Sequence, residues 1–333
     1  MEKSNVAIVG ATGMVGQEFI KILEQRRFPM TSVQLYASDR SHGRKMKVHG
    51  EELEVKETTA KSFDGIDIAL FSAGADISRR FSPIAAQAGA TVIDNSAAFR
   101  MEPDVPLVVP EVNPEDMKMH HGIIANPNCS TIQMVIVLYP LHKVNPIKRI
   151  TVATYQSVSG TGLAAIEELA TQSRLVLEGQ KTNPQVYPYQ IAFNVLPEID
   201  VFLQNGYTKE EWKMVEETHK IMHAPDIAIS ATCARVPVRI GHSEAVQVEF
   251  SHPMSPEEAK RILSKSPGVK LMDDPAARLY PYPLMVAGQD DVFVGRIRKD
   301  ASHPNGLVLW IVGDNLRKGA ALNAVQIAER LVQ

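Results

Sequence analysis

The chain has 333 residues, of which 44% are hydrophobic and 22% charged, and its formal net charge is −3. This length predicts two domains, because single hydrophobic cores stop growing near ~250–300 residues. The ordinary composition excludes a disordered, fibrous or membrane chain. No run of Lys and Arg is long enough to provide the positive surface that nucleic acid requires, so we expect no nucleic-acid partner.

Neither a secretion signal nor a membrane span is predicted. The apolar run near the N-terminus has four residues, far fewer than the apolar region of a signal peptide. The longest apolar stretch, 132–141, is interrupted by Gln133 and Pro140 and is shorter than the ~18–20 residues that span a bilayer. The only two cysteines, Cys129 and Cys233, lack the spacing of a disulfide framework or a zinc site. We therefore expect a cytoplasmic protein without a metal.

The first part of the chain alternates between strand and helix signals. A β-rich run at 5–9 leads into glycine-rich 10–16 and then a helical pattern with apolar residues at 19, 20, 22 and 23. Further strand signals occur at 33–37, 66–71 and 91–93, with a helix at 79–88. This alternation predicts an α/β fold with a Rossmann-like, doubly wound parallel sheet.

The pattern changes after about residue 130. Long alternating strands are predicted at 150–158, 227–238, 244–251, 291–298 and 306–312. They indicate a second, α+β domain with a mixed or antiparallel sheet that leaves one face open to contact. An extended loop is predicted at 182–197 and a terminal helix at 314–331.

A glycine-rich loop at 10–16 follows the first strand and opens a helix. In this context glycines let backbone amides and the helix N-terminus approach a pyrophosphate. The spacing is GxxGxxG instead of the commoner GxGxxG, so a simple strand-to-helix turn is the alternative. The position favours a dinucleotide-binding loop. Its predicted contacts are Gly10, Ala11, Thr12, Gly13, Met14 and Val15.

The end of the second predicted strand indicates which dinucleotide binds. An acid at this position binds the ribose of NAD, whereas Arg favours the 2′-phosphate of NADP. Asp39 is the only acid, and it is outnumbered by Ser38, Arg40, Arg44 and Lys45. We therefore predict NADP. A solvated charged turn would explain these charges but not their place directly after the strand.

Cys129 follows a polar Asn-Pro-Asn segment and precedes an apolar run, which places it in the first turn of a predicted helix with Asn128 as a candidate cap. The positive end of a helix lowers the pKa of a thiol and so favours a nucleophilic thiolate. Isolated cysteines are otherwise small buried hydrophobes, the role predicted for Cys233 inside a strand. Cys129 is therefore the candidate nucleophile.

His242 is the candidate base among the ten histidines. It follows segment 235–241, where charged residues alternate with apolar ones and Gly241 allows a tight turn. A histidine at a strand end is also found as a surface or structural residue, so that alternative stays open.

Together these segments resemble the aspartate-semialdehyde dehydrogenase family over nearly the whole chain. The matching segments, in order, are 10–13, 96–100, 126–131, 156–160, 210–213, 235–242 and 314–321. The resemblance implies NADPH-dependent reduction of L-aspartyl 4-phosphate to L-aspartate 4-semialdehyde through a cysteine thioester. That reaction belongs to the biosynthesis of lysine, threonine, methionine and diaminopimelate.

The resemblance also implies the roles of individual residues. The catalytic set is Cys129 as nucleophile, His242 as acid/base and Gln156 as the residue that orients the substrate. The substrate-binding set is Arg235 for the α-carboxylate, Glu210 for the ammonium, and Arg100 and Lys213 for phosphate. Guanidinium groups bind carboxylates and phosphates bidentately, and a carboxylate suits an amine.

By the same resemblance the C-terminal helix returns to the nucleotide domain. The predicted domains are 1–128 with 314–333 for NADP binding, and 129–313 for catalysis and dimerisation. Further cofactor contacts are assigned to Ser72, Ala73, Gly74, Asn95, Gly160 and Asn315. We expect a homodimer or a higher oligomer, with inorganic phosphate as the second small molecule. Arg317 departs from the small or uncharged residue expected at its position, which puts the cofactor contacts of 315–317 in question.

Two other functions compete with this interpretation. N-acetyl-γ-glutamyl-phosphate reductase shares the fold plan, thioester chemistry and NADPH, and differs in the contacts to the substrate head group. A non-catalytic NADPH-sensing regulator would need only the glycine-rich loop. That alternative leaves Cys129, Gln156 and His242 without a role.

Overall fold

The computed structural model describes residues 3–333 and divides into two compact units. The first unit runs to Asn128 and includes Gly319–Gln333, and the second is Cys129–Lys318. The predicted domains change at the same place after residue 128, whereas the second crossing was predicted after residue 313. Residues 1 and 2, which the predicted NADP-binding domain includes, lie outside the described residues.

The first unit is built on a seven-stranded sheet in the order β3-β4-β2-β1-β5-β6-β7. Its strands are β1 (Ser4–Val9), β2 (Met30–Ala37), β3 (Lys45–Val48), β4 (Glu51–Glu57), β5 (Ile68–Phe71), β6 (Thr91–Asp94) and β7 (Ile123–Ala125). All neighbouring pairs are parallel except β3 and β4. The predicted parallel sheet is confirmed, and the β3–β4 hairpin and β7 are additions to it.

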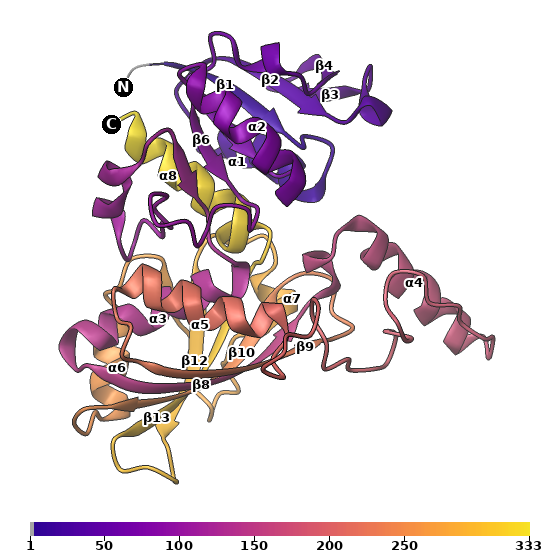
Figure 1. The fold of residues 1–333 in the computed structure, drawn as a ribbon. Helices are drawn as coiled ribbons and strands as arrows, with labels where there is room; N and C mark the ends of the chain where they lie inside the picture. The colour runs from indigo at the N-terminus through magenta and orange to yellow at the C-terminus, as the bar shows by residue number, and fades with distance from the viewer. Residues whose placement is uncertain (1–2) are drawn as a thin grey trace. The chain divides into compact units, whose positions relative to one another are not determined.

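Helices cover both faces of this sheet (Figure 1). Helices α1 (Met14–Gln25) and α8 (Leu322–Leu331) share one core with Val6 and Ile8 of β1. Helix α2 (Ala75–Gln87) packs into the other core with Ala7 and Val9. Because alternate residues of one strand enter opposite cores, the sheet lies between two helical layers, as the doubly wound prediction requires.

The second unit is built on a six-stranded sheet in the order β11-β12-β13-β10-β8-β9. Its strands are β8 (Ile147–Gln156), β9 (Ala228–Arg235), β10 (His242–Phe250), β11 (Val269–Leu271), β12 (Val292–Lys299) and β13 (Gly306–Gly313). The β11–β12 and β8–β9 pairs are parallel and the other three are antiparallel. The predicted mixed sheet is confirmed.

Three helices pack on one face of this sheet: α3 (Cys129–Val144), α5 (Lys209–Met222) and α6 (Pro256–Leu263). Figure 1 shows α3 and α5 beside each other over β8. Along β8 the residues facing these helices, such as Val152 and Thr154, are buried, whereas Tyr155 is 39% exposed on the opposite face. There its ring lies 5.6 Å from that of Trp310. Two further helices of the unit are α4 (Leu163–Leu177) and α7 (Pro283–Val286).

Two loop predictions have different outcomes. Residues 182–197 contain no helix, and Leu196 alone forms a bridge, to Arg235, so the extended loop is confirmed. The terminal helix does not start at residue 314. The Asp314 carboxylate instead accepts the backbone N–H of Leu316 at 2.8 Å and so forms a turn, after which a π-helical segment at Arg317–Ala321 leads into α8. Between residues 3 and 333 no helix is long and apolar enough to cross a membrane. The cytoplasmic location stays a prediction.

Candidate active site

The glycine-rich loop of the first unit lies where the strand order of the sheet reverses, between β1 and β5. Gly10 has a φ of +89°, and a Cβ there would lie 2.5 Å from the carbonyl oxygen of Ser72, just after β5. The N–H groups of Gly10 and Ala11 both donate to the Tyr36 carbonyl of β2, at 2.8 and 3.0 Å. Only glycine fits at residue 10, and the loop lies at the edge where doubly wound sheets bind ligands.

The start of helix α1 continues this cradle. Gly13 caps the helix, is exposed, and donates its N–H to the Gly10 carbonyl at 3.0 Å. A Cβ on Gly16 would lie 2.2 Å from the same carbonyl, so this glycine lets the helix pack against the loop. An exposed helix N-terminus behind a tight glycine turn is the arrangement that accepts a pyrophosphate. The residues present therefore fit a dinucleotide.

The other predicted cofactor residues of this unit surround the same strand ends. Gly74 has a φ of +89° and caps α2, and Ser72 and Ala73 precede it against Gly10. Asn95 follows β6, and its Oδ1 accepts the Asn126 side-chain N–H at 2.6 Å.

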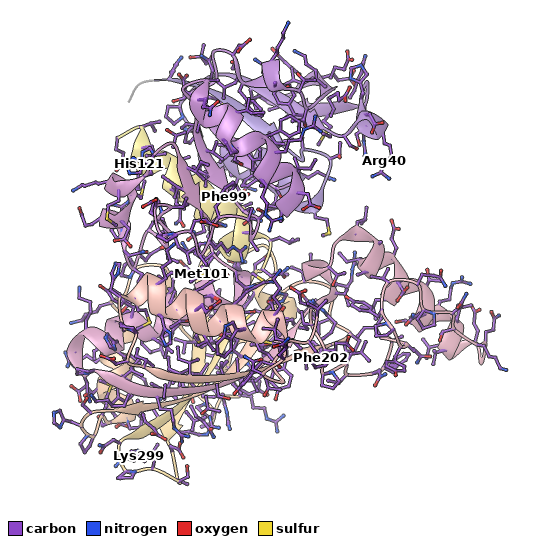
Figure 2. All side chains as sticks on the ribbon, in the orientation of Figure 1. Arg40, Phe99, Met101, His121, Phe202 and Lys299 are labelled. Atoms are coloured by element: carbon purple, nitrogen blue, oxygen red, sulfur yellow. The ribbon has the colours of Figure 1, made fainter. Side chains whose placement is uncertain are left out.

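Ser38, Asp39 and Arg40 follow β2 and are exposed. Asp39 Oδ1 accepts the backbone N–H of Arg40 at 2.8 Å, so the carboxylate helps to form the short helical turn Asp39–Ser41. Figure 2 shows the Arg40 side chain projecting outward from this unit. The Arg40 side chain therefore points toward solvent, where it could meet a 2′-phosphate.

Arg100 is buried in the first unit and holds two loops together. Its Nε donates to the carbonyl of Asn126 at 2.9 Å, and its Nη2 donates to the carbonyl of Asn95 at 3.0 Å. The guanidinium is thus fixed in place by main-chain acceptors. Its predicted contact with phosphate stays a prediction.

In the second unit, Cys129 is the first residue of α3, as predicted, and is half-buried and not part of a disulfide. Gln133 lies one helical turn later, and its side-chain N–H donates to the His242 carbonyl at 3.4 Å. Residues four apart share a helix face. The face of α3 that carries Cys129 is therefore turned toward the start of β10.

Strand register brings three predicted residues to the helix-facing side of the second sheet. Gln156 ends β8 and pairs with Arg235, which ends β9. His242 begins β10 on the other side of β8. All three side chains are buried. Gln156 lies far from Arg235 and His242 in the chain, so strand register brings it beside them.

The His242 ring is fully buried and has two different nitrogens. Nδ1 accepts the backbone N–H of Ser157 at 3.0 Å, whereas Nε2 has no hydrogen-bond partner among residues 3–333. Burial lowers the pKa of His242 well below its usual value, the positive charge of Arg235 acts in the same direction, and the Gly241 backbone opposes both. At neutral pH the imidazole is uncharged.

Gly160 lies against both His242 and Arg235. A Cβ there would lie 3.3 Å from His242 Nε2 and 2.9 Å from Arg235 Nη1. Arg235 Nη1 donates to the Ser157 carbonyl at 2.7 Å, while its buried Nε has no partner in the described part of the chain. Buried polar groups normally form hydrogen bonds, so these two nitrogens mark where a polar ligand would be bound.

Glu210 lies at the start of α5 between two predicted site residues. Its Oε1 accepts the side-chain N–H of Gln156 at 3.2 Å, and its Oε2 pairs with Lys213 at 3.2 Å. Lys213 also pairs with Asp200 at 2.8 Å, a residue that the sequence analysis missed. The pKa of Asp200 is lowered. Burial alone would raise this pKa, but the hydrogen bond and positive charge of Lys213 together lower it by more. The ammonium of Lys213 is thus shared between two carboxylates.

Glu211 ties α5 to β9. Its Oε2 accepts the N–H of Thr208 in a capping box at 2.7 Å, and its Oε1 accepts the backbone N–H of Cys233 at 2.9 Å. Cys233 itself is fully buried, and burial, assisted by Glu210, strongly raises the pKa of its thiol. The prediction that Cys233 is a core residue is confirmed.

The C-terminal segment of the second unit contains Asn315 and Arg317. Asn315 Oδ1 accepts hydrogen bonds from the Gly241 backbone N–H at 2.9 Å and from the Ser157 hydroxyl at 3.1 Å. Arg317 pairs with Asp290 at 2.7 Å. The charge that departs from the family pattern is thus compensated by a carboxylate. Contact between Asn315 and a cofactor stays a prediction.

Glu244 is a second residue that the sequence analysis missed. It lies two residues after His242 on the same face of β10, has no exposed surface, and neither carboxyl oxygen has a hydrogen-bond partner within residues 3–333. Burial raises the pKa of Glu244 well above its usual value, more than the neighbouring Gln133 amide lowers it. A neutral carboxyl could donate to Gln133 Oε1, which also lacks a partner in this region. No signal in the sequence distinguishes this glutamate from a solvent-facing one.

Family models match both units. Residues 5–120 match the NAD-binding domain of semialdehyde dehydrogenases, and residues 138–318 match their dimerisation domain. The fold is thus that of a semialdehyde dehydrogenase. No cluster of side chains suited to a metal ion occurs among the described residues.

Individual relatives narrow this class. Aspartate-semialdehyde dehydrogenase of Aquifex aeolicus is 56% identical over 98% of both chains. The crystal structure of aspartate-semialdehyde dehydrogenase II from Vibrio cholerae complexed with ASA is 48% identical, with a TM-score of 0.97 over 100% of this chain and 99% of that one. The Candida albicans enzyme with NADP is 27% identical, with a TM-score of 0.78 over 99% of both chains. The chain belongs to the aspartate-semialdehyde dehydrogenase family.

Proposed function

We propose that the protein catalyses the NADPH-dependent reductive dephosphorylation of L-aspartyl 4-phosphate to L-aspartate 4-semialdehyde. The observation that carries the proposal is the cluster at Gly160, where buried nitrogens of Arg235 and His242 lack partners among the described residues. This cluster lies in a chain that is 56% identical to an aspartate-semialdehyde dehydrogenase. Uncompensated buried donors in an enzyme mark the place of a substrate.

The α-amino acid end of the substrate would be held by opposite charges. Arg235 offers its free Nε to the α-carboxylate, and its Nη1 bond to the Ser157 carbonyl fixes the guanidinium plane. Glu210 offers its carboxylate to the ammonium, from the first turn of α5. Charge-assisted hydrogen bonds of this kind are about twice as strong as neutral ones.

Covalent chemistry would begin at Cys129. Its thiolate, favoured by the α3 N-terminus, attacks the acyl carbon, and the bond to phosphate breaks to leave a thioester. Gln156, held by Glu210 at 3.2 Å, orients the reacting carbonyl group, and His242 is the acid/base. NADPH supplies the hydride that reduces the thioester. Release of the aldehyde returns Cys129 to its starting state.

NADP is the proposed cofactor of the first unit. Gly10, Gly13 and the α1 N-terminus would hold the pyrophosphate, and Ser38 and Arg40 the 2′-phosphate. The remaining contacts are those of the prediction, with Ser72, Ala73, Gly74 and Asn95 in this unit.

Inorganic phosphate is the proposed second substrate of the reverse reaction. Lys213 would bind it after exchanging a carboxylate partner for the anion, and Arg100 is the second predicted contact. A homodimer through the uncovered face of the second sheet, where Tyr155 and Trp310 lie, agrees with the dimerisation-domain match at 138–318.

The test is a phosphate-dependent NADP reduction assay with a panel of semialdehydes. L-aspartate 4-semialdehyde should be oxidised and N-acetylglutamate 5-semialdehyde should not, because the neutral acetylated nitrogen would leave Glu210 without a charged partner. A higher kcat/KM for the acetylated substrate would favour N-acetyl-γ-glutamyl-phosphate reductase. Absence of turnover together with tight NADPH binding would favour a sensor.

A further inference from the structure

The ammonium of Lys213 binds two carboxylates. Its Nζ donates to Asp200 Oδ2 at 2.8 Å and to Glu210 Oε2 at 3.2 Å. Lys213 is also the predicted phosphate contact of the second unit, so a phosphate would need N–H donors that the carboxylates now use. Two carboxylates beside one ammonium leave an excess of negative charge, which repels an anion. Phosphate binding is therefore favoured when one carboxylate gives up its bond to Lys213.

Glu210 is the carboxylate that is harder to release. Its side chain is only 7% exposed, and its other oxygen accepts the Gln156 side-chain N–H at 3.2 Å. A buried carboxylate that loses its charged partner is strongly destabilised, because water cannot take the place of that partner. In the proposed function Glu210 also receives the ammonium of the substrate. Glu210 therefore stays in place.

Asp200 can release Lys213 more easily. Its side chain is 32% exposed, so water can solvate the oxygen that Lys213 leaves. Its Oδ1 accepts the backbone N–H of Val201 at 2.9 Å, and this bond does not involve Lys213. The carboxylate can therefore exchange one partner for water and keep its position.

The backbone holds Asp200 beside α5. Its φ of +68° lies in the left-handed region, which Asp and Asn adopt more readily than most residues. The carbonyl of the next residue, Val201, accepts the N–H of Lys209, the first residue of α5, at 2.8 Å. Lys213 follows Lys209 by one helical turn and lies on the same face. Main-chain geometry thus places Asp200 where it meets the ammonium.

We propose that Asp200 competes with phosphate for Lys213 and thereby sets the affinity of the site for phosphate. Before phosphate binds, Asp200 orients the Lys213 ammonium, and when phosphate binds, Asp200 exchanges this bond for water. Asp200 is thus a positioning residue that acts through Lys213. The proposal rests on the proposed function and identifies the carboxylate that the anion displaces. Because phosphate must replace an ion pair, it binds weakly, and phosphate released from the acyl phosphate leaves readily.

Asp200→Asn separates this competition from a purely structural role. The amide keeps the size of the side chain, an acceptor for Val201 and the left-handed backbone, and removes the charge. We expect KM for inorganic phosphate to fall about three- to five-fold, the effect of a partly exposed ion pair, with KM for L-aspartate 4-semialdehyde and for NADP unchanged. Loss of a merely structural residue would instead raise KM for phosphate. An unchanged or raised value would overturn the proposal.

The matched control is Glu115→Gln. It removes the same charge from another carboxylate–lysine pair, the exposed pair of Glu115 and Lys118. We expect this variant to leave KM for phosphate unchanged. An equal fall in Glu115→Gln and Asp200→Asn would mean that only the net charge of the protein matters, and would overturn the proposal.

A double-mutant cycle with Lys213→Ala tests whether the effect passes through Lys213. Lys213→Ala alone should raise KM for phosphate roughly ten-fold or more, because a charge-assisted bond to the anion is lost. In that background Asp200→Asn should have almost no effect, since no ammonium remains for which to compete. An equal fall in both backgrounds would mean that Asp200 repels phosphate by its charge alone, and would overturn the exchange.

A titration of inorganic phosphate followed by ³¹P NMR measures the exchange without turnover. The Kd of the NADP-bound protein for phosphate should fall by the same factor in Asp200→Asn. Asp200→Gly, which a φ of +68° also accommodates, should lower the Kd as well and replaces the amide variant if that variant does not fold. An unchanged Kd would refute the exchange. Absence of phosphate-dependent turnover in the unaltered protein would refute the proposed function instead.

Discussion

The candidate site of the first unit is formed by backbone groups, and that of the second unit by side chains. In the first unit the glycine-rich loop is a backbone site, in which a Cβ on Gly10 or Gly16 would lie 2.5 or 2.2 Å from a carbonyl oxygen. In the second unit the cluster around His242 is a side-chain site, assembled from the ends of β8 and β9 and the starts of β10 and α5. A backbone site depends on residues that lack a Cβ, and a side-chain site depends on the register of the strands. Substitutions should therefore separate nucleotide binding from chemistry.

Cys129→Ala should have the largest effect. We expect it to lower kcat by a factor on the order of 10⁴ or more, because loss of a nucleophile removes the covalent route. NADPH affinity, measured by fluorescence titration, should change only a few-fold, since the nucleotide loop belongs to the other unit. Cys233→Ala, at a buried thiol, is the control and should keep turnover. The reverse pattern would mean that the nucleophile is assigned wrongly.

Glu210→Ala should come next and act only on the second unit. Loss of a charge-assisted bond to the substrate ammonium should raise KM for L-aspartate 4-semialdehyde by about 100-fold, with a much smaller change for NADP. Glu216→Ala, on the exposed face of the same helix, is the control. An unchanged KM would remove Glu210 from the head-group site.

Arg40→Ala should act only on the first unit. Removal of a phosphate contact should weaken NADPH binding by about 1.5–3 kcal/mol and leave NADH binding unchanged. The preference for NADPH over NADH, measured by calorimetric titration, should therefore narrow. Lys47→Ala, on the exposed strand β3, controls for the general charge of this region. If the unaltered protein bound both cofactors equally, Asp39 would define the site in place of Ser38 and Arg40.

Glu244→Gln should have the smallest effect on turnover and should act through stability. The pKa of Glu244 is raised in the folded state, so the stability that its proton contributes is complete below the unfolded pKa of ~4.3 and declines as pH rises toward the folded value. Relative to Glu244→Gln, the unaltered protein should lose about 1.4 kcal/mol per pH unit in that window. Urea unfolding at several pH values measures this. A pH-independent difference, like that expected for Glu216→Gln, would show that Glu244 is ionised in the folded protein.

The sequence predicted the site of the first unit better than that of the second, because the first depends on neighbouring residues and the second on strand register. Strand alternation and the spacing of Gly10, Gly13 and Gly16 are local, so the parallel sheet and its loop could be predicted from neighbouring residues. In the second unit Gln156 and Arg235 become neighbours only through the register of β8 and β9, and their roles came from the family resemblance. Helix α5 was missed although Thr208 and Glu211 form a capping box at its start.

The positions of two charged groups could not be predicted at all. Asp200 reaches Lys213 from an irregular segment, and Glu244 occupies a strand position whose alternation with Ala245 would suit either face. Whether such a residue faces solvent or the core depends on tertiary packing, which strand alternation does not define. The pairing of Arg317 with Asp290 could not be predicted either, because Arg317 begins the π-helical segment and Asp290 lies in a separate loop.

The Glu211 carboxylate fixes the distance between two groups of the proposed substrate site. This carboxylate accepts the backbone N–H of Cys233 in β9 and also caps the start of α5. It therefore fixes the helix that bears Glu210 against the strand that ends at Arg235. In the proposed function, the separation between the ammonium and carboxylate contacts is then set by two anchored backbones and not by mobile side chains. The α-ammonium and α-carboxylate groups of any α-amino acid would be bound in the same way. In the proposed function, aspartate would then differ from its longer homologue in the number of carbon atoms between these two contacts and the acyl carbon that Cys129 attacks.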